Sequence, residues 1–242
     1  MELSLKADRL KEITDIVSAV VTETLVVIDE DEFKIRAVDE ANIAMVDISL
    51  LSKGFEEYNV EEEDIIGLNL ERVQQFLRIV DSDDLLEISK EEGKLRIKRD
   101  NLTQSIPLLD TENIQDPDIP DLDLPTEIKT EAKTIQTGVK AANNISDQVK
   151  VKVDEMKFSI EAEGKEDEID LTVYADQFGK YEVGEEIESL FALDYLKDMV
   201  SSVSSRAPIY LRLRSDHPME IEYNFAEGYG SALMMLAPRI EK

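Results

Sequence analysis

The chain has 242 residues, of which 42% are hydrophobic, enough for two domains of about 120 residues that each bury a core. Its 55 acidic and 27 basic residues give a formal net charge of −28, so contact with nucleic acid requires basic residues gathered on one face. The absence of cysteine excludes disulfides, thiolate nucleophiles and cysteine-ligated zinc. The sequence has no run of about 18 apolar residues and no recognisable signal peptide, which predicts a soluble intracellular protein.

The first half alternates between helix-like and strand-like patterns. Apolar residues recur at helical spacing from Arg9 to Thr22 and predict an amphipathic helix. Strand-like runs at 25–28, 33–38 and 43–50, joined by acidic turns, predict an antiparallel meander. A second helix is expected within GLNLERVQQFLRIV at 67–80, and the runs LLEIS, KLRIKR and TQSIPLLD are expected to close the half as strands.

The stretch from Asn101 to Leu122 divides the sequence. The stretch is acidic, and its prolines exclude a helix or a central strand. Alternating apolar residues indicate that it lies against a surface, with an inert spacer as the alternative. We therefore expect an N-terminal domain at 1–110, a connector at 111–125 and a C-terminal domain at 126–242.

The second half repeats the first. A helix is expected from Ile128 to Asn144, followed by the strands VKVKV, KFSIEAEG and EIDLTVYAD. Residues 26–35 align with 151–160 at an offset of 125, and residues 70–77 align with 193–200 at an offset of 123. Two matches at nearly equal offsets predict an internal duplication of an α+β unit rather than a coincidence among amphipathic segments.

No pattern in the sequence indicates catalysis. His217, the single histidine, stands in a turn before Pro218 without a cysteine or a nucleophile-elbow serine nearby. The glycines form no phosphate-binding loop, and the acidic clusters miss the EF-hand spacing. We therefore expect no enzyme, no metal site and no cofactor.

Basic residues occupy the polar faces of all four predicted helices. They are Lys11, Arg72, Arg78, Lys133, Lys140 and Lys197. If the repeats place these helices on one side of a sheet, a modest positive stripe results. The alternative is ordinary helix-surface lysines, since Glu12, Asp15 and Asp198 lie nearby.

Four segments resemble the proliferating cell nuclear antigen family of sliding clamps: AVDEANIAMVDISL at 37–50, GLNLERVQQFLRIV at 67–80, FALDYL at 191–196, and the ending MEIEYNF with LAPRIE. The resemblance covers the whole chain. It implies an α+β fold with a duplicated DNA-clamp domain, each half being helix, three strands, helix, three strands. It further implies a ring of three chains, with antiparallel sheets outside and helices lining a hole. The six basic residues named above would then face encircled double-stranded DNA.

The resemblance also implies a pocket beside the connector, where DNA polymerase, clamp loader, flap endonuclease and DNA ligase type clients dock a short motif. The matching positions are Val38, Ile43, Met45, Ile119, Pro120, Pro218, Met235, Leu236, Ala237 and Pro238. Core packing is the alternative, above all for Ile43 and Met45. Met235 stands where many relatives have tyrosine, and Pro117 lies near a position that is often leucine, so we expect a pocket wall of different shape.

Subunit contacts follow from the same resemblance. Ile106 and Leu108 would lie on an edge strand that pairs with the strand of Thr172 and Tyr174 in the next chain. The expected function is a DNA polymerase sliding clamp, a processivity factor that is not an enzyme. A subunit of a heteromeric or checkpoint-type clamp, or an acidic interaction scaffold, is the alternative. The expected location is the cytoplasm, with the nucleoid, in an archaeon, or the nucleus in a eukaryote, without membrane attachment.

Overall fold

The computed structural model describes residues 1–240 and divides into two compact units. The first unit comprises Met1–Val38, Val46–Asp118 and Asn224–Ala232. The second unit comprises Asp39–Met45, Ile119–Tyr223 and the described residues from Leu233 onward. One division, between Asp118 and Ile119, lies inside the predicted connector. The sequence did not indicate that two short segments belong to the unit built mainly from the other half.

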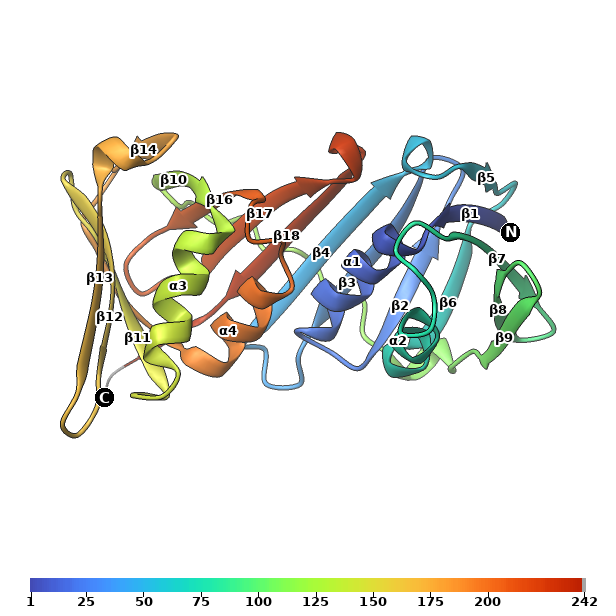
Figure 1. The fold of residues 1–242 in the computed structure, drawn as a ribbon, viewed down its shortest axis with the longest axis horizontal. Helices are drawn as coiled ribbons and strands as arrows, with labels where there is room; N and C mark the ends of the chain where they lie inside the picture. Colours follow the sequence, from blue (N-terminus) through green and yellow to red (C-terminus); the bar gives the residue numbers. More distant parts are fainter. Residues whose placement is uncertain (241–242) are drawn as a thin grey trace. The chain divides into compact units, whose positions relative to one another are not determined.

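The first unit contains two antiparallel sheets and two helices (Figure 1). Its elements are β1 (Glu2–Lys6), α1 (Ala7–Ser18), β2 (Glu23–Ile28), β3 (Glu32–Val38), β4 (Ala44–Leu51), β5 (Glu57–Asn59), β6 (Asp64–Asn69), α2 (Leu70–Leu77), β7 (Leu85–Glu91), β8 (Lys94–Arg99) and β9 (Leu102–Pro107). One sheet has the order β5-β1-β7-β8-β9, and in the other β6, β2, β3 and β4 follow one another. Helices α1 and α2 pack on each other.

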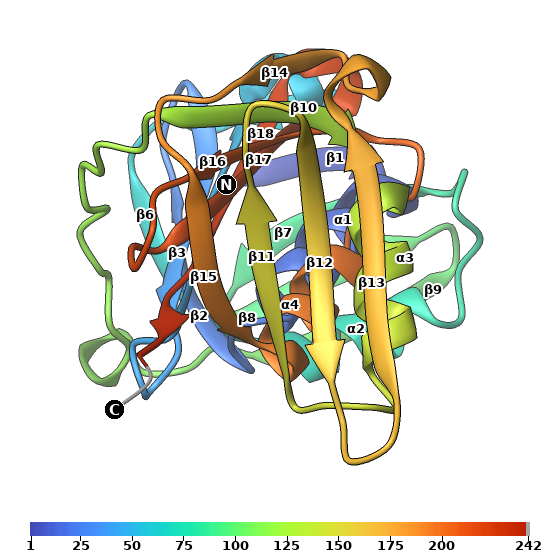
Figure 2. The ribbon, with the colours of Figure 1, turned by 90° about the vertical axis from the view of Figure 1, so that its left-hand side faces the viewer.

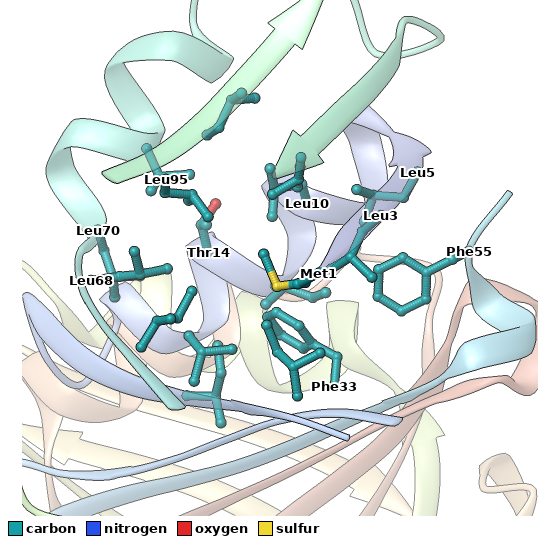
Figure 3. Close-up of a pocket in the computed structure, with 18 residues that line it drawn as sticks. Met1, Leu3, Leu5, Leu10, Thr14, Phe33, Phe55, Leu68, Leu70 and Leu95 are labelled. Atoms are coloured by element: carbon teal, nitrogen blue, oxygen red, sulfur yellow. The ribbon is translucent and has the colours of Figure 1, made fainter. Parts of the chain in front are cut away.

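The core of the first unit lies between its helices and its sheets. Figure 3 shows side chains from β1, α1 and several strands pointing toward one another, among them Leu3, Leu10, Phe33 and Leu95. These four side chains are at most 9% exposed. Burial of such apolar area, at about 25 cal/mol per Å², holds the helices on the sheets and fixes the direction of their polar faces.

The second unit repeats this arrangement. Its elements are β10 (Thr126–Glu131), α3 (Ala132–Ala142), β11 (Gln148–Val153), β12 (Lys157–Glu163), β13 (Glu168–Tyr174), β14 (Lys180–Glu182), β15 (Ile187–Ala192), α4 (Leu193–Ser201), β16 (Pro208–Leu213), β17 (Met219–Phe225), β18 (Gly230–Leu236) and β19 (Pro238–Arg239). One sheet has the order β13-β12-β11-β15-β19, of which β13, β12, β11 and β15 lie side by side in Figure 2. In the other, β14, β10, β16, β17 and β18 follow one another.

The duplication extends to single hydrogen bonds. Asp29 accepts from the backbone N–H of Asp31 and Glu32 in the β2–β3 turn, and Asp154 caps the β11–β12 turn in the same way. The hydroxyl of Tyr58 donates to the Asp29 carbonyl at 2.7 Å, and that of Tyr181 donates to the Asp154 carbonyl at 2.7 Å. The predicted duplication of an α+β unit is therefore confirmed.

The structure corrects several predicted boundaries. Gly67 and Asn69 belong to β6, and α2 begins only at Leu70, where the Asn69 side chain accepts from the Arg72 N–H. Ile128 lies in β10, and α3 begins at Ala132. In each half a strand precedes the first helix and two further strands precede the second helix. A strand runs directly into every helix, so no glycine or proline marks the change from period 2 to period 3.6.

Part of the stretch from Asn101 to Leu122 lies on the first unit. Leu109 forms a bridge with Gly67, where an added Cβ would lie 2.9 Å from the Leu109 oxygen, so glycine permits this close approach. Arg36 on β3 pairs with Asp116 at 3.1 Å. The prediction that this stretch lies against a surface is confirmed for these residues. None of the helices within residues 1–240 is long and apolar enough to cross a membrane.

Candidate DNA-facing, client and subunit surfaces

The first unit presents its predicted basic residues on solvent-exposed helix positions. Lys11 on α1, Arg72 on α2 and Arg78 directly after α2 are all exposed. The opposite faces of these helices are buried, because Ile13 and Phe76 pack into the core with at most 1% exposure. The amphipathic pattern therefore fixes these cations on the outside of the helix pair.

The second unit also exposes basic helix residues, at different positions. Lys133 and Lys140 on α3 are exposed, whereas Lys197 on α4 is half-buried. Lys140 and Lys197 line one open groove between α3 and α4. Lys197 lies 4.0 Å from Asp198, a contact too long and too exposed to neutralise it.

Many basic residues on the strands form ion pairs. Strand residues such as Lys98 with Glu87, at 2.9 Å, and Lys180 with Glu127, at 2.7 Å, neutralise each other. Within the described residues, five of the six predicted cations have no carboxylate within 4.0 Å: Lys11, Arg72, Arg78, Lys133 and Lys140. Exposed Lys6 and Arg206 share this property but were missed, because they lie just outside the helical pattern. These cations thus form no ion pair, although α1 also carries Asp8, Glu12 and Asp15, and α4 carries Asp194 and Asp198.

The loop at 39–43 carries Ile43, one of the predicted client residues, and hydrogen bonds hold it in place. The Ala237 N–H donates to the Ile43 carbonyl at 2.8 Å, which places this loop beside the end of β18. Buried Asp39 accepts from the N–H of Ile43 and Ala44, each at 2.7 Å, and from the Tyr195 hydroxyl at 2.9 Å. Burial opposes ionisation of Asp39, but the hydrogen bonds outweigh it and lower the pKa of its carboxyl.

Exposure separates the other predicted client residues into three groups. Ile119, which is 37% exposed, and Pro120 are accessible. Ile43, Pro218, Ala237 and Pro238 are half-buried, as is Val38 at the end of β3 in the first unit. Met45, Met235 and Leu236 are buried, and Leu236 has no exposed area, so its side chain supports the surface from below.

The two predicted interface strands are edge strands in their own sheets. β9 ends one sheet of the first unit and β13 ends one sheet of the second. Ile106 is buried in its own core, Leu108 and Thr172 are half-buried, and Tyr174 is 57% exposed. Ile106 can therefore contribute to pairing only through its main chain.

The strands at or beside these edges differ in charge. Strand β8, next to β9, has the basic sequence KLRIKR. The end of β12, the following turn and β13 hold these acids: Glu163, Glu166, Asp167, Glu168 and Asp170. Strand β9 itself has no charged residue, and Arg96, Lys98 and Arg99 of β8 are paired with Glu91, Glu87 and Asp84, so charge favours head-to-tail association only weakly.

No metal-binding cluster is found in the part of the chain that the structure describes. Residues 1–240 contain no group of three or more histidine, cysteine, aspartate or glutamate side chains arranged to hold a metal ion. His217 is exposed, and its Nδ1 lies 2.8 Å from the Ser215 carbonyl in the β16–β17 turn.

Comparison with known proteins identifies relatives over nearly the whole chain. Residues 1–111 match the family model of the proliferating cell nuclear antigen N-terminal domain, and residues 118–239 match that of its C-terminal domain. The chain is 39% identical to the DNA polymerase sliding clamp of Natronomonas pharaonis and 38% identical to that of Halobacterium salinarum. Both matches cover 97% of this chain and 96% of the relative.

A solved structure with the same fold comes from A. fulgidus. It is described as the C-terminal region of FEN-1 bound to A. fulgidus PCNA, with a TM-score of 0.93 and 31% identity over 100% of this chain and 99% of that chain. PCNA from Thermococcus kodakaraensis has a TM-score of 0.91 at 24% identity, covers 98% of this chain and 99% of its own, and supports the fold alone.

Proposed function

The chain belongs to the proliferating cell nuclear antigen family, and from this premise we propose that it is a DNA polymerase sliding clamp. The observation that carries the proposal is the pair of family matches, which together span both halves of the duplicated fold. Relatives at 38–39% identity that bear this name support it. In this proposal the chain is a non-enzymatic processivity factor that retains replication enzymes on DNA.

Three copies close into a ring around duplex DNA. Non-specific contacts to backbone phosphates give dissociation constants of about 10⁻⁴ to 10⁻⁶ M at physiological salt, which is too weak to retain a polymerase. Stronger contacts would slow the movement of the clamp along the DNA. Closure retains the clamp by topology instead. The unpaired cations of α1, α2 and α3 then centre the duplex without reading its bases.

Edge pairing between β9 and β13 closes the ring. Each strand has one unpaired side in its own sheet. Head-to-tail contacts of this kind form a closed trimer when each joint turns by a third of a circle. A heteromeric ring, in which this chain alternates with related chains, is the second candidate, and mixing with such chains followed by mass measurement separates the two.

Client enzymes dock on the second unit beside the connector. The similar A. fulgidus structure, described as holding the C-terminal region of FEN-1, supports a peptide-docking surface. In this chain the accessible Ile119 and Pro120, with half-buried Ile43 and Ala237, form its apolar centre. A few apolar anchors from the client would supply most of the affinity.

The test is clamp-dependent DNA synthesis on a primed circular template. Alanine replacement of four residues together, Lys11, Arg78, Lys140 and Lys197, should abolish stimulation of the polymerase while light scattering still gives a trimer. Undiminished stimulation would reject the DNA-facing surface. A parent protein that stays monomeric at micromolar concentration, alone and with related chains, would reject the ring itself.

A further inference from the structure

The two helix pairs are equivalent by duplication but differ in charge. The confirmed offsets place α3 residues 125 positions after those of α1, and α4 residues 123 positions after those of α2. Lys140 therefore corresponds to Asp15, and Lys197 corresponds to Gln74. The two positions that carry lysine in the second unit carry an acid and an amide in the first.

In the first unit, these two positions bind each other. The Gln74 Nε2 donates to the Asp15 Oδ1 at 3.2 Å, which bridges α1 and α2. The carboxylate repels an incoming phosphate, and the amide that could donate to it is already engaged. The middle of the α1–α2 pair is therefore unsuited to an anion.

In the second unit, the corresponding place is an open groove with free donors. Its polar lining comprises Gln136, Lys140, Asn143, Lys197 and Ser201. Gln136 bridges the helices by donating to the carbonyls of Val200 and Val203, at 2.7 and 2.9 Å, so it fixes the groove. Lys140 has no carboxylate within 4.0 Å, and Asn143 and Ser201 are exposed beside it.

We propose that the α3–α4 groove seats one phosphate of the DNA backbone between Lys140 and Lys197, and that the α1–α2 pair provides no such seat. The proposal rests on the function proposed above and gives it a definite geometry: phosphates are held at every second domain around the ring. Lysine suits this role because its ammonium is a mobile point charge that can follow a phosphate as the duplex moves. Asn143 and Ser201 add neutral donors.

The experiment measures binding of the trimer to a short linear duplex, without topological retention, by fluorescence anisotropy over a range of potassium chloride concentrations. The double variant Lys140→Ala/Lys197→Ala removes the seat. The matched control Lys53→Ala/Lys157→Ala removes the same charge from residues outside the groove. A third variant, Asp15→Lys/Gln74→Lys, copies the seat into the first unit.

Removal of the seat should reduce the slope of log affinity against log salt by about 0.9 for each subunit that contacts the duplex, because the seat holds one phosphate and each phosphate contact contributes about 0.9. The control should keep the parental slope, and the copied seat should steepen it. An equal loss of slope in the control would overturn the proposal, because the effect would then come from the net charge and not from the groove.

Two further arms separate the remaining explanations. Inorganic phosphate at constant ionic strength competes for the same two lysines, so it should weaken duplex binding by the parent more than duplex binding by the double variant; equal weakening of both would contradict the seat. A parental trimer without salt-dependent duplex binding would overturn the proposed function together with the seat, whereas normal parental binding with an unchanged double variant would overturn the seat alone.

Discussion

Replacing Asp39 with alanine removes an acceptor that serves four donors in the second unit. Its Oδ1 accepts from Ile43 and Ala44, and its Oδ2 accepts from the Ala41 N–H at 3.1 Å and from Tyr195. Hydrogen bonds to a charged group contribute about 1.5–3 kcal/mol each, and they are not additive. Because the exposed end of the loop can be rehydrated, we expect a local cost of about 3 kcal/mol for Asp39→Ala.

Two milder variants rank the individual bonds. Asp39→Asn can keep a carbonyl oxygen for Ile43 and Ala44 but turns an amide donor toward the Ala41 N–H. We therefore expect a loss of about 1–2 kcal/mol in local stability. Tyr195→Phe removes one donor and should cost about 1 kcal/mol. The exposed neighbour Glu40 is the matched control, since Glu40→Ala removes the same charge without removing a hydrogen bond.

Amide hydrogen exchange at Ile43 and Ala44 measures these costs directly. A loss of 3 kcal/mol corresponds to about 100-fold faster exchange through local opening. Protection in Asp39→Ala within threefold of the parent would refute the reasoning. The folded pKa of Asp39 lies below its unfolded value, so the stabilisation is complete above the unfolded pKa and disappears as pH falls through the folded pKa.

Three further predictions concern the other surfaces. Ile119→Asp should weaken binding of a client peptide at least tenfold in calorimetry without changing the trimer mass, and an unchanged affinity would misplace the client surface. Tyr174→Lys should shift trimer dissociation in sedimentation to at least tenfold higher protein concentration, whereas Tyr229→Lys, at a 40% exposed tyrosine, should not; equal shifts would contradict the proposed edge. Burial raises the pKa of Glu220, against the influence of Arg212, so Glu220→Gln should maintain or increase thermal stability at pH 7, and any gain should shrink as pH falls through the folded pKa; a clear loss at pH 7 would contradict this assignment.

The duplication could be predicted from sequence because periodicity survives within each repeat. The match of VVIDEDEFKI with VKVDEMKFSI reports the same β-hairpin, in which Asp29 and Asp154 cap equivalent turns. The first residues of the helices are harder to predict from sequence. Gly67 and Ile128 were assigned to helices because the strands continue into the helices without turn residues, so local pattern offers no stop signal.

The basic helix residues could also be chosen from sequence, since exposure follows from the apolar face that each helix buries. Long-range contacts decided the rest. The sequence placed Lys140 and Lys197 on separate helices, and only the packing of α3 on α4 brings them to one groove. Likewise, Asp39 and Tyr195 are 156 residues apart, and no local rule links a turn aspartate to a helix tyrosine.

By itself, the sequence determined which segments repeat, which helix faces are polar and where acidic charge predominates, because each depends on neighbours within a few residues. Only the tertiary structure decided which strands end a sheet, which carboxylates neutralise which cations and which half keeps an open anion groove. These depend on contacts between residues far apart in the chain: Asp15 and Gln74 bind each other across one helix pair, whereas their counterparts Lys140 and Lys197 line an open groove in the other.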